Sequence, residues 1–464
     1  MGNFKYLALV CIVASLGGLL FGFDTAVISG TVGMVESQFG LSKLALGWFT
    51  SSALVGCIIG ALAAGGLGDT YGRKPVLMGA AILFFASALG STIPPSFTVL
   101  ISVRIIGGMG VGLASVISPL YISEFSPPGI RGRLVALYQL SIVTGIMLAY
   151  FSNWMLQQYS AGHAGISGHS EMAGFLYKMM VAEVWRAMFG MEMLPALLLL
   201  ALLFLVPESP RWLIQAGRGD QGRHILEMIS GKKVAGKEFT EILQSLKEGK
   251  GRMGELFRPG LRRALMIAVG LSVFGQLTGI NAVIYYGPEI LKQAGIQFGN
   301  ALQFQTLLGI INLIFTILAL LLIDKLGRRP LLVGGMAAVV ITLILAGLLF
   351  KEDHPNGLLI VIVLGVYIAC IAFSICAVIW VLTPEILPNR VRGRAMSIAT
   401  FSNWTTNTLA AYLFPWYVAS FGMHVGFFTF GVICLAATLF FWKFVPETKG
   451  RSLEQIARFF RPTS

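Results

Sequence analysis

Charged residues are scarce in this sequence. Asp, Glu, Lys and Arg make up 12% of its 464 residues, whereas hydrophobic residues make up 56%. A soluble globular protein carries about 25% charged residues. Cysteine is also rare, and its five copies lack the CxxC spacing of zinc and redox sites. This composition argues against a soluble protein and favours a protein embedded in a membrane.

Long apolar runs fill most of the chain. A helix needs about 20 mostly apolar residues to cross a bilayer, and lipid offers backbone groups no hydrogen-bond partners. We therefore predict an all-α membrane protein with twelve transmembrane helices in two six-helix halves. The predicted spans are 7–29, 45–68, 75–93, 97–120, 134–157, 185–206, 264–288, 303–323, 331–350, 358–384, 395–418 and 423–445. The first span follows MGNFKY without a small-residue cleavage site, so we expect it to remain as helix 1.

The net charge of +13 follows this topology. With both termini in the cytoplasm, all but six of the 34 Lys and Arg residues fall in cytoplasmic segments, as the positive-inside rule requires. The charge therefore gives no reason to expect a nucleic-acid partner. We expect a multi-pass protein of the inner or plasma membrane with both termini cytoplasmic.

Similar motifs recur at corresponding places in the two halves. GDTYGRKP follows the second span and DKLGRRP the eighth, EFSPPGIRGR follows the fourth and EILPNRVRGR the tenth, and PESPR and PETKG follow the sixth and twelfth. Acids paired with arginines at inner helix ends can form salt bridges that hold one face closed. The predicted gating residues are Asp69, Arg73, Glu124, Arg131, Asp324, Arg328, Glu385 and Arg392. Plain positive-inside topology explains the arginines but not the acids.

The repeat also suggests a domain organisation. We predict an N-terminal half at 1–208, a cytoplasmic linker with short amphipathic helices at 209–260, a C-terminal half at 261–446 and a cytoplasmic tail at 447–464. Six-span halves around a midplane site are common in alternating-access transporters.

Together these motifs resemble the sugar porter family of the major facilitator superfamily over roughly residues 5–455. The resemblance is strongest to bacterial proton-coupled D-xylose and glucose symporters, and mammalian glucose facilitators are more distant. It implies a proton-coupled pentose or hexose symporter, with a small sugar, a proton and the bilayer as partners. No cofactor, metal or obligatory protein partner is expected.

Ionisable side chains are almost absent from the spans, although such residues usually mark function. Asp24, Arg104 and Glu192 are the exceptions well inside them. At 1.5 Å per residue, Asp24 and Arg104 lie at a similar depth, near 10 Å below the outer surface, and can pair. FGFDTAVISG resembles the helix-1 segment of the symporters, whereas uncoupled facilitators carry Asn at the position of Asp24. We expect this pair to couple protons, with Glu192 as a second candidate; a static packing pair is the alternative.

Sugar binding needs amides that both donate and accept hydrogen bonds, together with an aromatic face. The spans supply both, although interhelical packing is the usual role of a single Asn or Gln. The predicted sugar-binding residues are Gln139, Gln276, Asn281, Asn312, Trp380, Asn403, Trp404 and Asn407. The resemblance adds Phe21 to this site, and Tyr285 and Tyr286 as an outer gate.

Three departures from the family pattern bear on the choice of sugar. Gly275 stands where the family usually doubles the glutamine, and Ile146 and Cys376 replace a Gln and a Trp of the D-xylose type. Three other functions fit the sequence less well: an uncoupled facilitator, which Asp24 argues against; a sugar receptor; and a membrane enzyme, for which no span holds a catalytic cluster. His163 and His169, in the 158–184 loop, are expected to be solvated rather than to bind metal.

Overall fold

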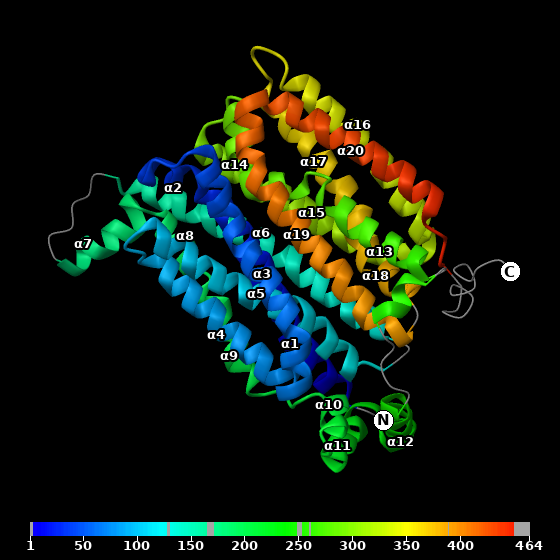
Figure 1. Cartoon of the computed structure of the whole chain (residues 1–464). Helices are drawn as coiled ribbons and strands as arrows, with labels where there is room; N and C mark the ends of the chain where they lie inside the picture. The colour runs from blue at the N-terminus through cyan, green and yellow to red at the C-terminus, as the bar shows by residue number, and fades with distance from the viewer. Residues whose placement is uncertain are drawn as a thin grey trace. The chain divides into compact units, whose positions relative to one another are not determined.

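The computed structural model describes residues 3–127, 130–164, 171–247, 253–258, 261–387 and 389–449, and all regular structure within these ranges is helical. Figure 1 shows the order of the helices along the chain. His169 and most of the predicted 447–464 tail lie outside the described residues.

Eleven segments of the described chain are long and apolar enough to cross a membrane. Seven are single helices: α3 (Lys43–Tyr71), α4 (Arg73–Thr92), α5 (Phe97–Phe125), α6 (Arg131–Gly162), α15 (Phe298–Leu326), α16 (Arg328–Leu349) and α20 (Met423–Phe444). The other four are built from two consecutive helical pieces each. Each of the eleven overlaps one of the predicted spans.

The remaining predicted span, 395–418, lies in helix α19 (Asn389–Phe421), which at 33 residues is long enough to cross a bilayer. It is absent from the eleven because it is more polar. The segment from Asn403 to Thr408 alone carries two Asn and three Thr. Length therefore supports this twelfth span, whereas apolar composition alone does not.

Four spans are interrupted, which hydropathy did not predict. The consecutive pieces are α1 (Phe4–Val27) and η1 (Ile28–Gly30), α8 (Trp185–Gly190) and α9 (Met193–Leu203), α13 (Leu261–Gln276) and α14 (Ile280–Gln293), and α17 (Gly357–Phe373) and α18 (Ile375–Ile386). Gly279 has φ +89° at the break before α14, a conformation that glycine adopts without strain. Broken helices in transporters place backbone and side chains where ligands bind.

Three short helices of the predicted linker lie together (Figure 1). They are α10 (Pro210–Gln215), α11 (Gly219–Ser230) and α12 (Lys232–Lys247), followed by the 3-10 turn η3 (Met253–Phe257). Ile214, Leu226 and Ala235, one from each helix, form a small buried core. Residues 210–247 thus form short helices whose apolar sides meet, which is consistent with the linker predicted there.

The remaining elements follow the first and fifth spans. They are α2 (Val32–Phe39), α7 (Glu171–Tyr177) and the π-helical turn η2 (Lys178–Ala182). Gln38 Nε2 donates to Glu183 Oε2 at 3.0 Å, and the Trp185 indole donates to Gln38 Oε1 at 2.6 Å. These contacts tie the segment that follows span 1 to the start of span 6.

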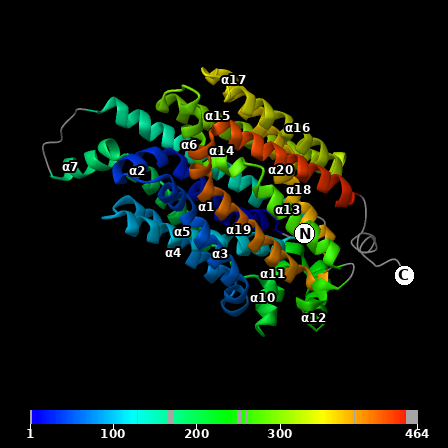
Figure 2. The same ribbon diagram turned by 45° about the horizontal axis from the view of Figure 1, so that its top comes forward.

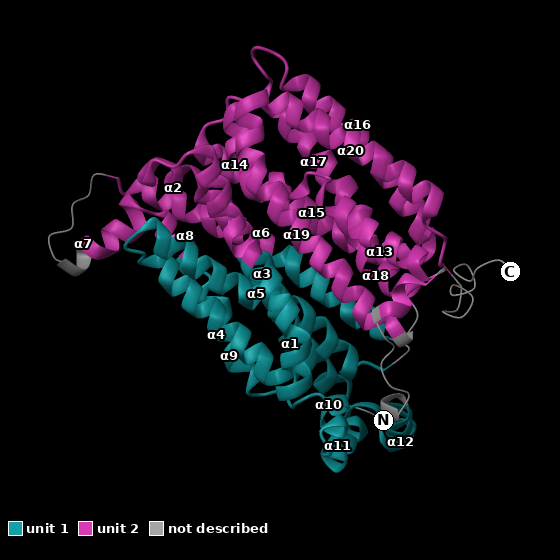
Figure 3. Cartoon of the chain, viewed as in Figure 1, with its two compact units in different colours: residues 1–24, 56–145, 190–251 teal, residues 25–55, 146–189, 252–464 magenta. Residues whose placement is uncertain are grey.

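By contacts, the chain forms two compact units (Figure 3). Unit 1 comprises 1–24, 56–145 and 190–251, and unit 2 comprises 25–55, 146–189 and 252–464. In unit 1, α4 contacts α5 and α9. In unit 2, α16 and α20 run side by side, as Figures 1 and 2 both show.

Candidate functional site

Asp24 and Arg104 form a buried ion pair within unit 1. Arg104 Nη1 lies 3.6 Å from Asp24 Oδ1, and the two side chains are 2% and 4% exposed respectively. The prediction from depth that these residues pair is thus matched by the geometry. Because removing either partner of a buried pair leaves an uncompensated charge, the two side chains are energetically coupled.

Glu192 lies in the break between α8 and α9 and is 1% exposed. It is close enough to interact electrostatically with both Asp24 and Arg104. Within the described residues, its Oε1 atom accepts no hydrogen bond. A buried carboxylate of this kind is costly unless it holds a proton or binds water, so this cluster can store a proton.

A glycine allows the helices to approach one another beside this cluster. A Cβ atom at Gly107 would lie 2.3 Å from Ser87 Oγ and 4.0 Å from Asp24 Oδ1. Any side chain at position 107 would therefore displace Ser87 of α4.

Three of the predicted sugar-binding amides form a chain in unit 2. Gln276 Nε2 donates to Asn403 Oδ1 at 2.7 Å, and Asn281 Nδ2 donates to Gln276 Oε1. Gln276 ends α13, Asn281 lies in the first turn of α14, and Asn403 belongs to α19. We call these three residues the amide triad. The helix break at 277–279 brings its first two members within reach of each other.

The predicted gate tyrosines also contact α19. Tyr285 OH and Asn407 exchange hydrogen bonds at 3.0 and 3.3 Å, and Tyr286 OH donates to the carbonyl of Ala411 at 2.8 Å. Both tyrosines are buried. These hydrogen bonds join the middle of α14 to α19.

The other predicted sugar-binding residues are not linked to the triad by a described hydrogen bond. Trp404 is buried in α19, and Trp380 in α18 is 43% exposed. Asn312 in α15 is partly buried, as are Gln139 in α6 and Phe21 in α1, the last two in unit 1.

The predicted acid and arginine pairs at the helix ends form inside each unit. Arg73 Nη2 lies 3.0 Å from Glu124 Oε1 in unit 1, and Arg328 Nη2 lies 3.1 Å from Glu385 Oε1 in unit 2. Each arginine also contacts the acid four residues before it, Asp69 at 3.5 Å and Asp324 at 3.0 Å. Both halves of the repeat therefore build the same cluster.

Arg131 and Arg392, predicted at the same helix ends, make a different contact. Arg131 Nε donates to the carbonyl of Ser126 at 3.4 Å, and Arg392 Nε donates to that of Leu387 at 3.1 Å. Among the described contacts, neither forms an ion pair. Burial lowers the pKa of Arg392.

Sequence reasoning missed Glu208 and Glu447, the acids of the PESPR and PETKG motifs. The Glu208 carboxylate accepts from the backbone N–H of Arg73 at 3.0 Å and of Lys74 at 3.1 Å. The Glu447 carboxylate accepts from the N–H of Arg328 at 3.2 Å and of Arg329 at 3.1 Å. Glu208 thus caps the start of α4 and Glu447 the start of α16, where a negative charge is favoured. The Pro-Glu pair, which recurs in PESPR and PETKG, is the sequence signal that could have identified these two residues.

The two caps differ in electrostatics. Burial raises the pKa of Glu208 and outweighs the N–H groups of Ser209, Arg73 and Lys74. At Glu447 burial also acts to raise the pKa, but hydrogen bonds from four N–H groups lower it overall. Glu447 is thus the better stabilised anion.

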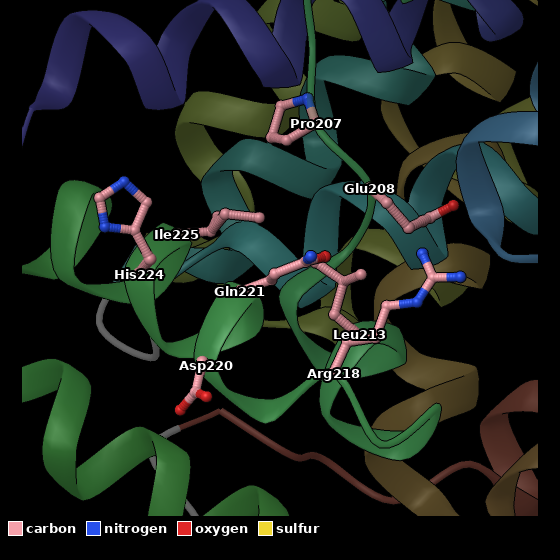
Figure 4. A pocket seen from close by; sticks show the side chains of 8 residues that line it. All are labelled: Pro207, Glu208, Leu213, Arg218, Asp220, Gln221, His224 and Ile225. Atoms are coloured by element: carbon pink, nitrogen blue, oxygen red, sulfur yellow. The ribbon is translucent and has the colours of Figure 1, made fainter.

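A surface hollow of about 520 Å³ lies beside the linker helices α10 and α11, away from the amide triad in sequence (Figure 4). Its lining residues are Pro207, Glu208, Leu213, Arg218, Asp220, Gln221, His224 and Ile225. It mixes acidic and basic side chains and contains none of the predicted sugar-binding residues.

Comparison with known proteins gives a consistent result. A family model described as "Sugar (and other) transporter" matches residues 10–460. The arabinose-proton symporter of Bacillus subtilis (strain 168) is 39% identical and aligns over 98% of this chain and 95% of its own. The D-xylose-proton symporter of Escherichia coli (strain K12) is also 39% identical, over 99% and 97%.

Solved structures agree. The partially occluded inward-open xylose transporter XylE from E. coli matches with a TM-score of 0.83 and 37% identity, covering 97% of this chain and 100% of that one. The same proton:xylose symporter bound to 6-bromo-6-deoxy-D-glucose matches with a TM-score of 0.82 and 38% identity, covering 99% and 100%.

Proposed function

Because this chain belongs to the sugar transporter family, we propose that it is a proton-coupled sugar symporter that works by alternating access. The observation that carries the coupling is the buried Asp24–Arg104 pair, at 3.6 Å. A proton on Asp24 removes the charge that attracts Arg104, so protonation and helix movement are linked. Glu192 interacts with both and is a second proton acceptor on the same path.

The proposed sugar contacts come from each unit separately. Unit 2 offers the amide triad with Asn312, Trp380, Trp404 and Asn407, and unit 1 offers Phe21 and Gln139. Uncharged amides bind hydroxyls and also release them, as a carrier requires. The two relatives described above are named as symporters of arabinose and D-xylose, which are pentoses, and this supports a small monosaccharide, a pentose or hexose, as the substrate.

We further propose how the chain lies in the membrane and how it moves. The chain lies in the plasma or inner membrane with both termini facing the cytoplasm, since this orientation leaves most Lys and Arg residues in cytoplasmic segments. The moving parts are the sequence halves 1–208 and 261–446, joined by the linker 209–260. Asp69, Arg73, Glu124 and Arg131, with Asp324, Arg328, Glu385 and Arg392, gate the inner face, and Tyr285 and Tyr286 the outer.

Uptake into proteoliposomes tests this function. A panel of radiolabelled pentoses and hexoses is offered with and without an inward proton gradient. Accumulation above equilibrium only with the gradient is the expected result. Equilibration without accumulation would instead indicate a uniporter, and the absence of uptake for every sugar would favour a receptor.

A further inference from the structure

A buried hydroxyl group lies beside the ion pair of unit 1. The atoms nearest to a Cβ at Gly107 of α5 belong to Ser87 of α4, and the next is Asp24 Oδ1 at 4.0 Å. The Ser87 hydroxyl and the Asp24 carboxylate therefore lie within 4.0 Å of the same point. Ser87 is 2% exposed. The surroundings of the Asp24–Arg104 pair thus include a polar group that carries no charge.

The next turn of α4 carries a second serine. Ser91 follows Ser87 by four residues, so the two hydroxyls share one face of the helix. Ser91 is 1% exposed. A Cβ atom at Gly90 would meet Val103 Cγ1 at 2.7 Å, and Val103 directly precedes Arg104 on α5. Both serines therefore lie at the level of the ion pair.

The end of α4 also contacts the helix break that carries Glu192. A Cβ atom at Gly190 would lie 3.1 Å from Thr92 Oγ1, and α4 packs against α9. Glu192 is two residues beyond Gly190, and Ser91 directly precedes Thr92. Glu192 and Ser91 are thus on neighbouring segments at a similar depth.

Both of these side chains hold an oxygen atom without a hydrogen-bond partner among the described residues, namely Ser91 Oγ and Glu192 Oε1. A buried serine in a helix often donates to a carbonyl of the preceding turn, as Ser52 does at 2.9 Å. Buried polar groups that lack such a partner are ordinarily satisfied by an ordered water, which makes about three hydrogen bonds. A hydroxyl and a carboxyl at the same level form a binding site for one water.

We infer that Ser87 and Ser91, with a water bound at Ser91, carry protons between Glu192 and Asp24. This inference rests on the proposed function and deepens it, because it names the groups that connect the two proton acceptors. The O–H bond of protonated Glu192 breaks as the water accepts its proton, and a new O–H bond forms on the Asp24 carboxylate. The water and each hydroxyl accept one proton and donate another, so all three are regenerated. The negative charge moves from Asp24 to Glu192.

Threonine and valine provide a matched pair of substitutions at position 91. Ser91→Thr keeps the hydroxyl, whereas Ser91→Val replaces it with a methyl group in a side chain of the same shape. The pair therefore separates hydrogen bonding from packing. Ser91→Ala and Ser87→Ala remove each hydroxyl without adding volume. The control is Ser102→Ala, which removes an exposed hydroxyl of α5 that donates to the carbonyl of Thr98 at 2.9 Å.

The experiment measures two rates in proteoliposomes with radiolabelled D-xylose, L-arabinose and D-glucose. One is the initial rate of uptake driven by an inward proton gradient, and the other is the rate of sugar-for-sugar counterflow, which moves no net proton. Ser91→Val, Ser91→Ala and Ser87→Ala should each slow gradient-driven uptake roughly 2- to 12-fold, because each removes one hydrogen bond from the path. Counterflow should stay at the wild-type rate. Ser91→Thr and Ser102→Ala should match the wild type in both assays.

Two results would overturn the inference. One is gradient-driven uptake by Ser91→Val that equals uptake by Ser91→Thr. The other is an equal loss of uptake and counterflow, which would show that the hydroxyls act only in packing. If thermal melts show that the Thr or Val variant is unfolded, Ser91→Ala and Ser87→Ala decide by the same comparison with wild type. A wild type that accumulates none of the three sugars would instead overturn the proposed function.

Discussion

Gly72 lies so close to Glu208 that a Cβ atom at position 72 would fall 2.2 Å from the carboxylate oxygen Oε2. Gly327 and Glu447 repeat the arrangement at 2.7 Å. The two glycines have φ values of +103° and +95°, which disfavour any other residue. Each half thus uses a glycine to bring the first N–H groups of a span onto an acid, although the two acids differ in pKa.

We expect Glu447→Gln to lower thermal stability at pH 7 more than Glu208→Gln. The lowered pKa of Glu447 means that its charge stabilises the fold at neutral pH, a contribution lost as pH falls through that pKa, below the ordinary 4.5. The raised pKa of Glu208 means that the fold disfavours its charged form relative to the unfolded chain, so Glu208→Gln removes no such stabilising charge. Thermal melts of the wild type and the two variants at pH 7 and pH 4 measure the loss of stability in each variant. Equal losses at pH 7, or a gap that does not narrow at pH 4, would contradict this reasoning.

Removing an acid from either cluster should favour the inward-open state. In Glu124→Gln or Glu385→Gln, Arg73 or Arg328 loses its charged partner, so states that depend on the intact cluster become less populated. Cysteine labelling from the cytoplasmic side should then increase. The matched control is Glu241→Gln, which makes the same chemical change at an exposed acid of the linker. Unchanged labelling in both cluster variants would leave these charges with a purely topological role.

Loss of a single sugar-binding amide should weaken binding moderately. Gln276→Ala, Asn281→Ala and Gln139→Ala are each expected to cost ~0.5–1.5 kcal/mol, roughly 2- to 12-fold in affinity, because each removes a hydrogen-bonding amide. Trp380→Ala removes an aromatic face instead and should also weaken binding. Calorimetry at matched expression measures this. Ser397→Ala, which removes an exposed hydroxyl of α19 bonded to its own helix, is the control. If all four variants bind as wild type does, the sugar site lies elsewhere.

The spans were predictable because hydropathy and helix length are local properties. Their interruptions were not, because the break at 277–279 is bonded by partners distant in sequence: Tyr367 OH donates to the carbonyl of Thr278 at 2.9 Å, and Cys434 Sγ donates to the same carbonyl at 3.8 Å. No periodicity encodes those contacts.

Site residues divide in the same way. The Asp24–Arg104 pair followed from counting depth along two helices, because helix rise is fixed. The capping roles of Glu208 and Glu447 could not be predicted, because they depend on the positive φ angles of Gly72 and Gly327, which a sequence motif does not reveal. The bonds within the amide triad depend on where α13 breaks, so composition predicted its members but not their order.

Asp24→Asn should separate sugar binding from proton coupling. The amide resembles a permanently protonated Asp24, so the attraction to Arg104 is lost while the buried volume is kept. Accumulation driven by a pH gradient should vanish, sugar affinity should stay within a few-fold of wild type, and sugar-for-sugar exchange should persist because it moves no net proton. Proteoliposome uptake, binding and counterflow assays measure these three quantities.

Two further variants make this result interpretable. Asp220→Asn makes the same chemical change at an exposed acid of the linker, and this variant should transport sugar normally. Arg104→Ala should also uncouple transport. It leaves the buried Asp24 carboxylate without its partner, which costs ~3–5 kcal/mol in stability. A thermal melt in the presence of sugar must therefore show that this variant is folded. If Asp24→Asn still accumulates sugar against its gradient, the proton resides elsewhere. Glu192 is then the residue to substitute, because it is the other buried acid of the cluster.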